Sequence, residues 1–181
     1  MFNTFFSFLI KPTEVTKEIL SFDNKTKDIV TVSIVVLYFI SWQLLAYMML
    51  PELYLLWISA LSVVTAFAMS FIGFYSFNLG MQLFGKAIGG KGSFRDVSVV
   101  TAYSMFIYVI LTPLISIVSK VLWLGFIGTA SMLIPLVWFL IIYSKSLSQA
   151  QQFSETKVLV NVLVVGGIFY FIIAVLPKLG L

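Results

Sequence analysis

Long stretches without a charged residue alternate with short polar segments along the whole chain. Each uncharged stretch is at least as long as the roughly 20 residues that a helix needs to cross a hydrocarbon layer about 30 Å thick. The pattern therefore predicts an all-α, polytopic integral membrane protein, a bundle of five transmembrane helices. We place the spans at about 29–50, 54–85, 97–118, 122–144 and 158–177.

The first 28 residues differ from the predicted transmembrane domain, 29–181, and form a cytoplasmic amphipathic segment in this interpretation. Its apolar residues recur at helical spacing: Phe2, Phe5, Phe6 and Leu9. Pro12 then interrupts the pattern and starts a new turn of helix. A short N-terminal helix of this kind either lies at the membrane interface or packs on the protein's own helices. A polar hinge, 21–28, separates it from the first span.

Small residues form a stripe along the second span, at steps of three, four, four, three and seven: Ser59, Ser62, Ala66, Ser70, Gly73 and Gly80. In lipid, small side chains allow another helix to approach closely. We therefore expect the second helix to be the packing centre of the bundle.

Polar side chains inside the spans are few, and the ones we single out are Gln43, Tyr103, Ser104 and Asn161. A polar group in hydrocarbon must find a partner, so Gln43 is expected to bond a neighbouring helix. Hydroxyl groups of the third span can bond across helices or back to their own carbonyls. Pro113 and Pro135 make the third and fourth spans irregular, which leaves a transport role for these two helices as an alternative.

A glycine-rich basic break, 89–96, separates the second span from the third. Its glycines let one helix stop and the chain reverse, and Ser93 with Asp96 is typical of a capping pair that starts the next helix. A second interpretation is a contact patch for an anionic headgroup or a protein. The cations of that patch would be Lys86, Lys91 and Arg95.

Composition narrows the possible chemistry. The 181 residues are 61% hydrophobic and only 10% charged, whereas soluble domains carry about a quarter charged residues. The chain has no cysteine and no histidine, so it lacks thiolate nucleophiles, imidazole bases and the usual zinc ligands. We expect no cofactor, no metal and no enzymatic activity.

The distribution of Lys and Arg predicts the orientation. Nine of them fall on the side of the N-terminus, and only Lys120 and Lys178 fall on the other. The positive-inside rule then puts the N-terminus and both polar loops in the cytoplasm and the C-terminus outside. The net charge of +4 on that face favours anionic lipid as a partner, because nucleic acid would require a denser patch with stacking aromatics.

Several short segments, in this order against five spans, resemble the Yip1 family of small membrane proteins. They are Lys11-Pro12 with Val15 and Ile19, the run from Gly85 to Arg95, Thr101-Ala102-Tyr103-Ser104, and Ser154-Glu155-Thr156-Lys157. The resemblance implies a cytosolic N-terminus and association with copies or relatives. Eukaryotic members are linked to small GTPases of the Rab type, vesicle traffic and membrane shaping.

This chain lacks the long cytosolic N-terminal region of the eukaryotic members, which favours a compact prokaryotic member in the cytoplasmic membrane. In a eukaryote the resemblance would instead imply the endoplasmic reticulum or Golgi, with a small GTPase as partner. Our first hypothesis is a non-enzymatic membrane scaffold that acts in membrane organisation, shaping or trafficking through its cytoplasmic face. The second is a small transporter or channel that uses the third and fourth helices.

Overall fold

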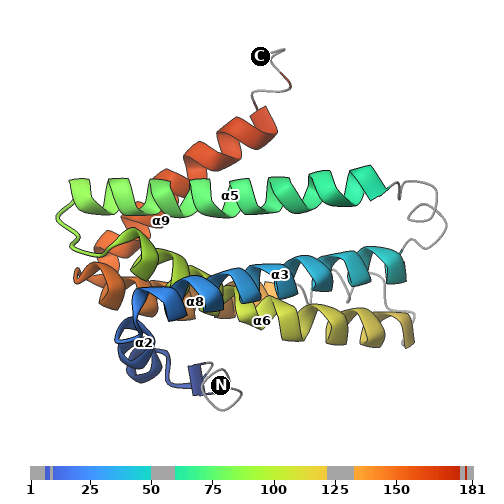
Figure 1. Ribbon diagram of the computed structural model, residues 1–181, viewed down its shortest axis with the longest axis horizontal. Coiled ribbons are helices and arrows are strands. Elements are labelled where there is room, and N and C mark those ends of the chain that lie inside the picture. The colour runs from blue at the N-terminus through green and yellow to red at the C-terminus, as the bar shows by residue number, and fades with distance from the viewer. Residues whose placement is uncertain (1–6, 9, 50–59, 122–132, 176–177, 179–181) are drawn as a thin grey trace.

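A computed structural model describes residues 7–8, 10–49, 60–121, 133–175 and 178 of the chain. The elements in this part are helices (Figure 1): α2 Pro12–Leu20, α3 Asn24–Met49, α5 Ala60–Ala87, α6 Phe94–Val121, α8 Leu133–Gln151, α9 Glu155–Tyr170 and the π-helical turn η1 Phe171–Val175. The all-α prediction is confirmed for the described residues.

Four of the described helices are long and apolar enough to cross a membrane: Asn24–Leu44, Ser62–Ala87, Phe94–Leu114 and Leu133–Gln151. They correspond to the first four predicted spans. The last predicted span coincides with α9, which has 16 residues, and with η1, which continues it to Val175. The predicted turn at 51–52 lies outside the described residues.

α3 and α8, the helices of the first and fourth predicted spans, are longer at one end than the sequence pattern indicated. α3 begins at Asn24, not at Ile29, because Asp23 accepts a hydrogen bond from the Thr26 amide at 3.1 Å and thereby caps the first turn. The predicted hinge therefore belongs mostly to the helix. α8 likewise continues to Gln151, so the predicted polar loop after 144 shrinks to a turn of three residues, 152–154.

The packing centre is α6 and not α5 as we expected. The most apolar stretch of α6 is 61% buried, whereas that of α5 is 11% buried. α6 lies against α3 along much of its length and also contacts α8 (Figure 1). α5 is an outer helix that packs on α9 and on part of α6, and its exposed apolar side chains include Val64, Met69 and Ile72.

The N-terminal segment packs on the bundle. Val15, Thr16 and Ile19 of α2 are buried, and the Thr16 hydroxyl lies 2.9 Å from Ser146 Oγ of α8. Phe8 is 1% exposed, with its ring 5.4 Å from that of Tyr103. These residues are therefore buried in the interior of the protein and do not lie at a membrane interface. The residues Phe2, Phe5, Phe6 and Leu9 lie outside the described part of the chain.

Candidate functional site

Charged and strongly polar side chains gather at one end of the bundle, where α5 and α8 end and α3, α6 and α9 begin. We call it the polar end. Two turns meet here, one between α5 and α6 and one between α8 and α9 (Figure 1). The Lys91 amide donates to the Gln151 carbonyl at 2.9 Å, and the Lys157 ammonium donates to the Ile88 carbonyl at 2.7 Å. These bonds tie the two turns together.

The glycine-rich break acts as a helix stop and restart. Gly89 has a φ of +95°, a conformation that other L residues rarely adopt. Ser93 and Asp96 form a reciprocal capping box: the Asp96 amide donates to Ser93 Oγ at 3.2 Å, and the Ser93 amide donates to Asp96 Oδ2 at 3.1 Å. The predicted capping pair is therefore confirmed.

The turns approach each other so closely that side chains would not fit at three glycines, Gly85, Gly90 and Gly92. A Cβ atom added to Gly92 would lie 2.5 Å from the Ala150 carbonyl oxygen, and one added to Gly85 would lie 2.7 Å from Gln151 Nε2. Real Cβ contacts are essentially never shorter than 3.0 Å. Glycine is needed at these positions because the Ala150 backbone and the buried Gln151 amide lie where a side chain would begin.

Two buried amides lie beneath these turns. Gln151 is fully buried, and within the described part of the chain neither atom of its side-chain amide has a hydrogen-bond partner. Asn161 of α9 is also fully buried, and its Nδ2 donates to the Met81 carbonyl of α5 at 2.9 Å. Asn161 thus joins two helices through a polar contact, as is common in membrane bundles.

Ion pairs connect the starts of α3 and α6. Lys27 Nζ lies 2.7 Å from Asp96 Oδ1, with the Lys27 side chain 8% exposed. Arg95 Nε lies 3.0 Å from Asp28 Oδ1, and both of these side chains are about half exposed. The sequence does carry a signal for this arrangement, since a basic and an acidic residue adjoin at both helix starts, but our sequence reasoning did not pair them.

The three cations proposed as a contact patch have different surroundings. Arg95 bonds the Asp28 carboxylate and is therefore part of the bundle's own structure. Lys86 lies exposed in the last turn of α5, and the side chain of Lys91 is exposed on the turn that follows. Among the described residues no carboxylate lies within 4.0 Å of either ammonium. The Lys86 ammonium donates to the side-chain oxygen of Gln82, a neutral group of the same helix, at 3.2 Å.

The polar side chains singled out inside the spans are partly or wholly buried. Tyr103 is 1% exposed, and Ser104 donates to the Val100 carbonyl of its own helix at 2.8 Å. Gln43 is partly buried on α3. Sequence reasoning missed a buried contact between helices, in which Thr101 of α6 bonds Asn78 of α5.

The small-residue stripe of α5 has mixed surroundings. Gly80 packs on α9, since a Cβ there would lie 3.0 Å from Val165 Cγ1. A Cβ at Gly73 would meet no atom within 4 Å. The Ser70 hydroxyl donates to the Ala66 carbonyl at 2.8 Å. Ser62 and Ala66 are exposed, and Ser59 lies outside the described residues.

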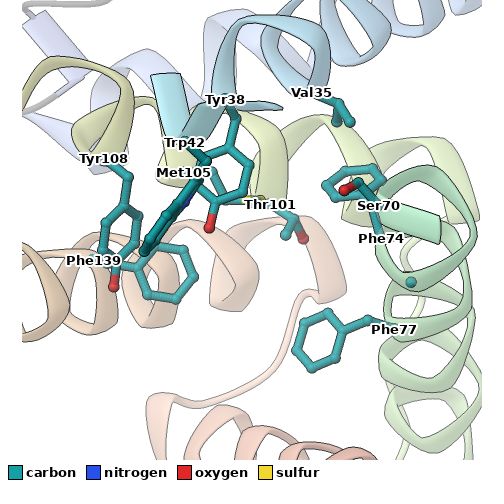
Figure 2. A pocket seen from close by; sticks show the side chains of 11 residues that line it. Val35, Tyr38, Trp42, Ser70, Phe74, Phe77, Thr101, Met105, Tyr108 and Phe139 are labelled. Carbon is teal, nitrogen blue, oxygen red and sulfur yellow. The ribbon is translucent and has the colours of Figure 1, made fainter. Parts of the chain in front are cut away.

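Beside Gly73, a cavity of about 460 Å³ separates α5 from α3, α6 and α8. Figure 2 shows aromatic side chains of α3, α6 and α8 on one side, and Ser70, Phe74 and Phe77 of α5 on the other. The aromatic rings touch in sequence: Trp42 to Tyr38, Tyr38 to Tyr108 and Tyr108 to Phe139, with centroids 6.2, 6.2 and 5.6 Å apart. None of the described lining residues carries a charge at neutral pH.

The described part of the chain offers no metal centre, since no three His, Cys, Asp or Glu side chains gather in it. Its long apolar helices, with charges collected at one end, define a multi-pass integral membrane protein. A family model, the Yip1 domain, matches residues 6–176, nearly the whole chain. The chain therefore belongs to the Yip1 domain family, as the sequence segments had indicated. Comparisons with curated proteins and with solved structures gave no match.

Proposed function

We propose that this protein is a non-enzymatic membrane scaffold that contacts anionic lipid headgroups through Lys86 and Lys91 of the polar end. The observation that carries the proposal is the exposure of both residues beside the helix stop: Lys86 lies in the last turn of α5, and Lys91 lies on the following turn, which the bond from the Lys91 amide to the Gln151 carbonyl fixes. A fixed turn loses little conformational freedom when it binds. Each cation near an anionic membrane surface contributes about 1 kcal/mol.

The proposal includes an orientation. The polar end faces the cytoplasm, because the excess of Lys and Arg lies there and the cytoplasmic leaflet carries the anionic lipids. The N-terminus is then cytoplasmic, the C-terminus lies outside, and α9 with η1 completes a fifth crossing. In a prokaryote the membrane would be the cytoplasmic one.

Partners other than lipid belong to the same proposal. α5 exposes small residues, Ser62 and Ala66, through which a copy of the chain or a related membrane protein would approach. A small GTPase enters only for a eukaryotic host. Nucleic acid is not among the proposed partners.

The test compares lipids that differ only in the headgroup. Detergent-purified protein is given equal amounts of phosphatidylglycerol and phosphatidylcholine with the same chains, and bound lipid is counted by native mass spectrometry. We expect the double variant Lys86→Gln/Lys91→Gln to lower the preference for phosphatidylglycerol by roughly thirtyfold, since two contacts of about 1 kcal/mol are lost.

A matched control removes the same charge elsewhere. Lys17 and Lys25 are exposed on α2 and α3, so Lys17→Gln/Lys25→Gln changes the net charge equally without touching the turn. An equal loss of preference in both double variants would contradict a defined contact at Lys86 and Lys91. Arg95→Gln should leave the preference almost unchanged, because that guanidinium already bonds Asp28.

The cavity favours a second candidate, a transporter that uses α6 and α8. Thr101, Met105 and Tyr108 of α6 and Phe139 of α8 line it together with residues of α3 and α5. Because the lining is uncharged and rich in aromatic rings, it suits an apolar molecule better than an ion.

A further inference from the structure

We infer that the cavity between α5 and the aromatic wall of α3, α6 and α8 holds the hydrocarbon chain of a membrane lipid. This inference does not rest on headgroup binding at Lys86 and Lys91. It rests on the depth, lining, opening and volume of the cavity.

The cavity lies near the middle of the hydrocarbon layer. Tyr38 follows Lys27 by eleven residues on α3, which places it about 16 Å along the helix from the polar end at 1.5 Å per residue. The hydrocarbon layer is about 30 Å thick. At this depth the surrounding solvent is lipid chain, so the material that reaches the cavity from the side is hydrocarbon.

The lining offers little to a polar ligand. The Thr101 hydroxyl bonds Asn78 and the Val97 carbonyl, and the Ser70 hydroxyl bonds the Ala66 carbonyl. The other polar groups of the lining residues are the hydroxyls of Tyr38 and Tyr108 and the indole N–H of Trp42, and the rest of the lining is aromatic or aliphatic (Figure 2). Apolar cavities stay free of water, and an unfilled one forfeits the dispersion contacts of its walls. A hydrocarbon chain restores those contacts.

The cavity opens sideways toward the lipid. Trp42 lines it and is nevertheless 43% exposed, and Gly73 on the opposite wall is exposed as well. The volume of about 460 Å³ falls within the range of about 300–1,000 Å³ that is typical of sites for small molecules. A chain can therefore enter between α3 and α5 without a rearrangement of the helices.

The test uses phosphatidylcholine with a diazirine midway along one acyl chain. Its neutral headgroup keeps the result independent of Lys86 and Lys91. After reconstitution and irradiation, mass spectrometry maps the adducts. We expect adducts on the lining residues Met105, Tyr108 or Phe139, in addition to those that any surrounding lipid forms on Leu37 and Ile40, which are exposed on α3.

Gly73→Leu then fills the cavity from the α5 side, where the new Cβ meets no atom within 4 Å. Adducts on the lining residues should fall roughly tenfold, a change that corresponds to about 1.4 kcal/mol, while adducts on Leu37 and Ile40 stay constant. Gly167→Leu is the matched control, because that glycine of α9 also has no atom within 4 Å of its Cβ position and does not line the cavity. It should change neither set of adducts.

Three results would overturn the inference. The first is that adducts form on the outer residues Leu37 and Ile40 alone. The second is that Gly73→Leu leaves the yield of adducts on the lining residues unchanged. The chain has no cysteine, so Met105→Cys gives a single thiol. Its modification by a water-soluble maleimide would show a water-filled route for a solute and would likewise overturn it. If Gly73→Leu fails to fold, Ser70→Leu fills the cavity from the same α5 side, and an unchanged yield of lining adducts there contradicts the inference.

Discussion

At the polar end Gly85 and Gly92 have no room for a Cβ atom, whereas a Cβ at Gly73, twelve residues before Gly85 on the same helix, would meet no atom within 4 Å. Gly92 allows the Ala150 backbone to approach, and Gly85 allows the buried Gln151 amide to approach. Gly73 instead borders the cavity. The same residue type therefore has opposite roles along α5. The polar end is held by close packing and polar bonds, and the cavity side is left open toward lipid.

The two regions therefore contribute differently to the structure. The polar end joins α3, α5, α6, α8 and α9 through ion pairs and bonds between turns, so it sets the positions of the helices. Farther along, α5 has few neighbours and is mostly exposed. A substitution should therefore lower stability at the polar end and alter lipid occupancy at the cavity.

The largest effect should come from breaking the buried ion pair at the polar end. Lys27→Met leaves the Asp96 carboxylate without its ammonium partner in a site where Lys27 is 8% exposed. We expect the free energy of unfolding in detergent to fall by about 3 kcal/mol, because loss of one partner leaves a poorly solvated charge. Denaturant titration followed by circular dichroism measures this change.

The exposed pair beside it provides the control. Asp28→Asn breaks the bond to Arg95, where both side chains are about half exposed, and should cost about 0–1 kcal/mol. Lys27→Met/Asp96→Asn, which removes both charges, should recover part of the loss. Equal effects of Lys27→Met and Asp28→Asn would contradict the view that the buried pair contributes more to stability than the exposed pair.

A smaller effect, of opposite sign in the two regions, is expected for alanine at two of these glycines. Gly92→Ala should lower the free energy of unfolding by about 2 kcal/mol, because the Cβ would lie 2.5 Å from the Ala150 carbonyl and the turns must shift. Gly73→Ala should raise it by up to about 1 kcal/mol, since alanine is the better helix former and space is free. The same unfolding titration measures both, and equal signs would contradict the comparison.

Much of this fold could be predicted from the sequence, because a membrane span depends on length and hydrophobicity alone. The first four spans, the capping box of Ser93 and Asp96, and the family all follow from local patterns. The stripe of small residues on α5 predicted close packing along the helix, but spacing does not say whether a neighbour is present. Gly80 has one in Val165, and Gly73 has none within 4 Å.

The candidate sites were harder to predict because they depend on contacts between distant segments. Arg95 looked like a free cation until Asp28, 67 residues away, was found beside it. The cavity draws residues from four helices, and no local motif indicates it. Gln151 looked like part of a solvated loop and is fully buried beneath two turns. Lys91 is exposed on the turn after α5.

The smallest predicted effect concerns the cap of α3 at the exposed edge of the polar end. Hydrogen bonds from the Thr26 side chain and amide lower the pKa of Asp23 below its ordinary value of 3.8. A carboxyl group whose pKa is lowered by folding stabilises the folded state above its ordinary pKa, and this contribution is lost as the pH falls through the lowered value. Thr26→Val removes the side-chain bond, so the variant should be slightly less stable than the wild type at pH 7. The difference should shrink as the pH falls below about 4, which thermal unfolding from pH 7 to pH 3 measures. A difference in stability between wild type and Thr26→Val that stays constant over this range would mean that Thr26 stabilises the helix start independently of the Asp23 charge.

Asp23→Asn, which removes that charge, is the control. Its difference in stability from the wild type should also narrow at low pH.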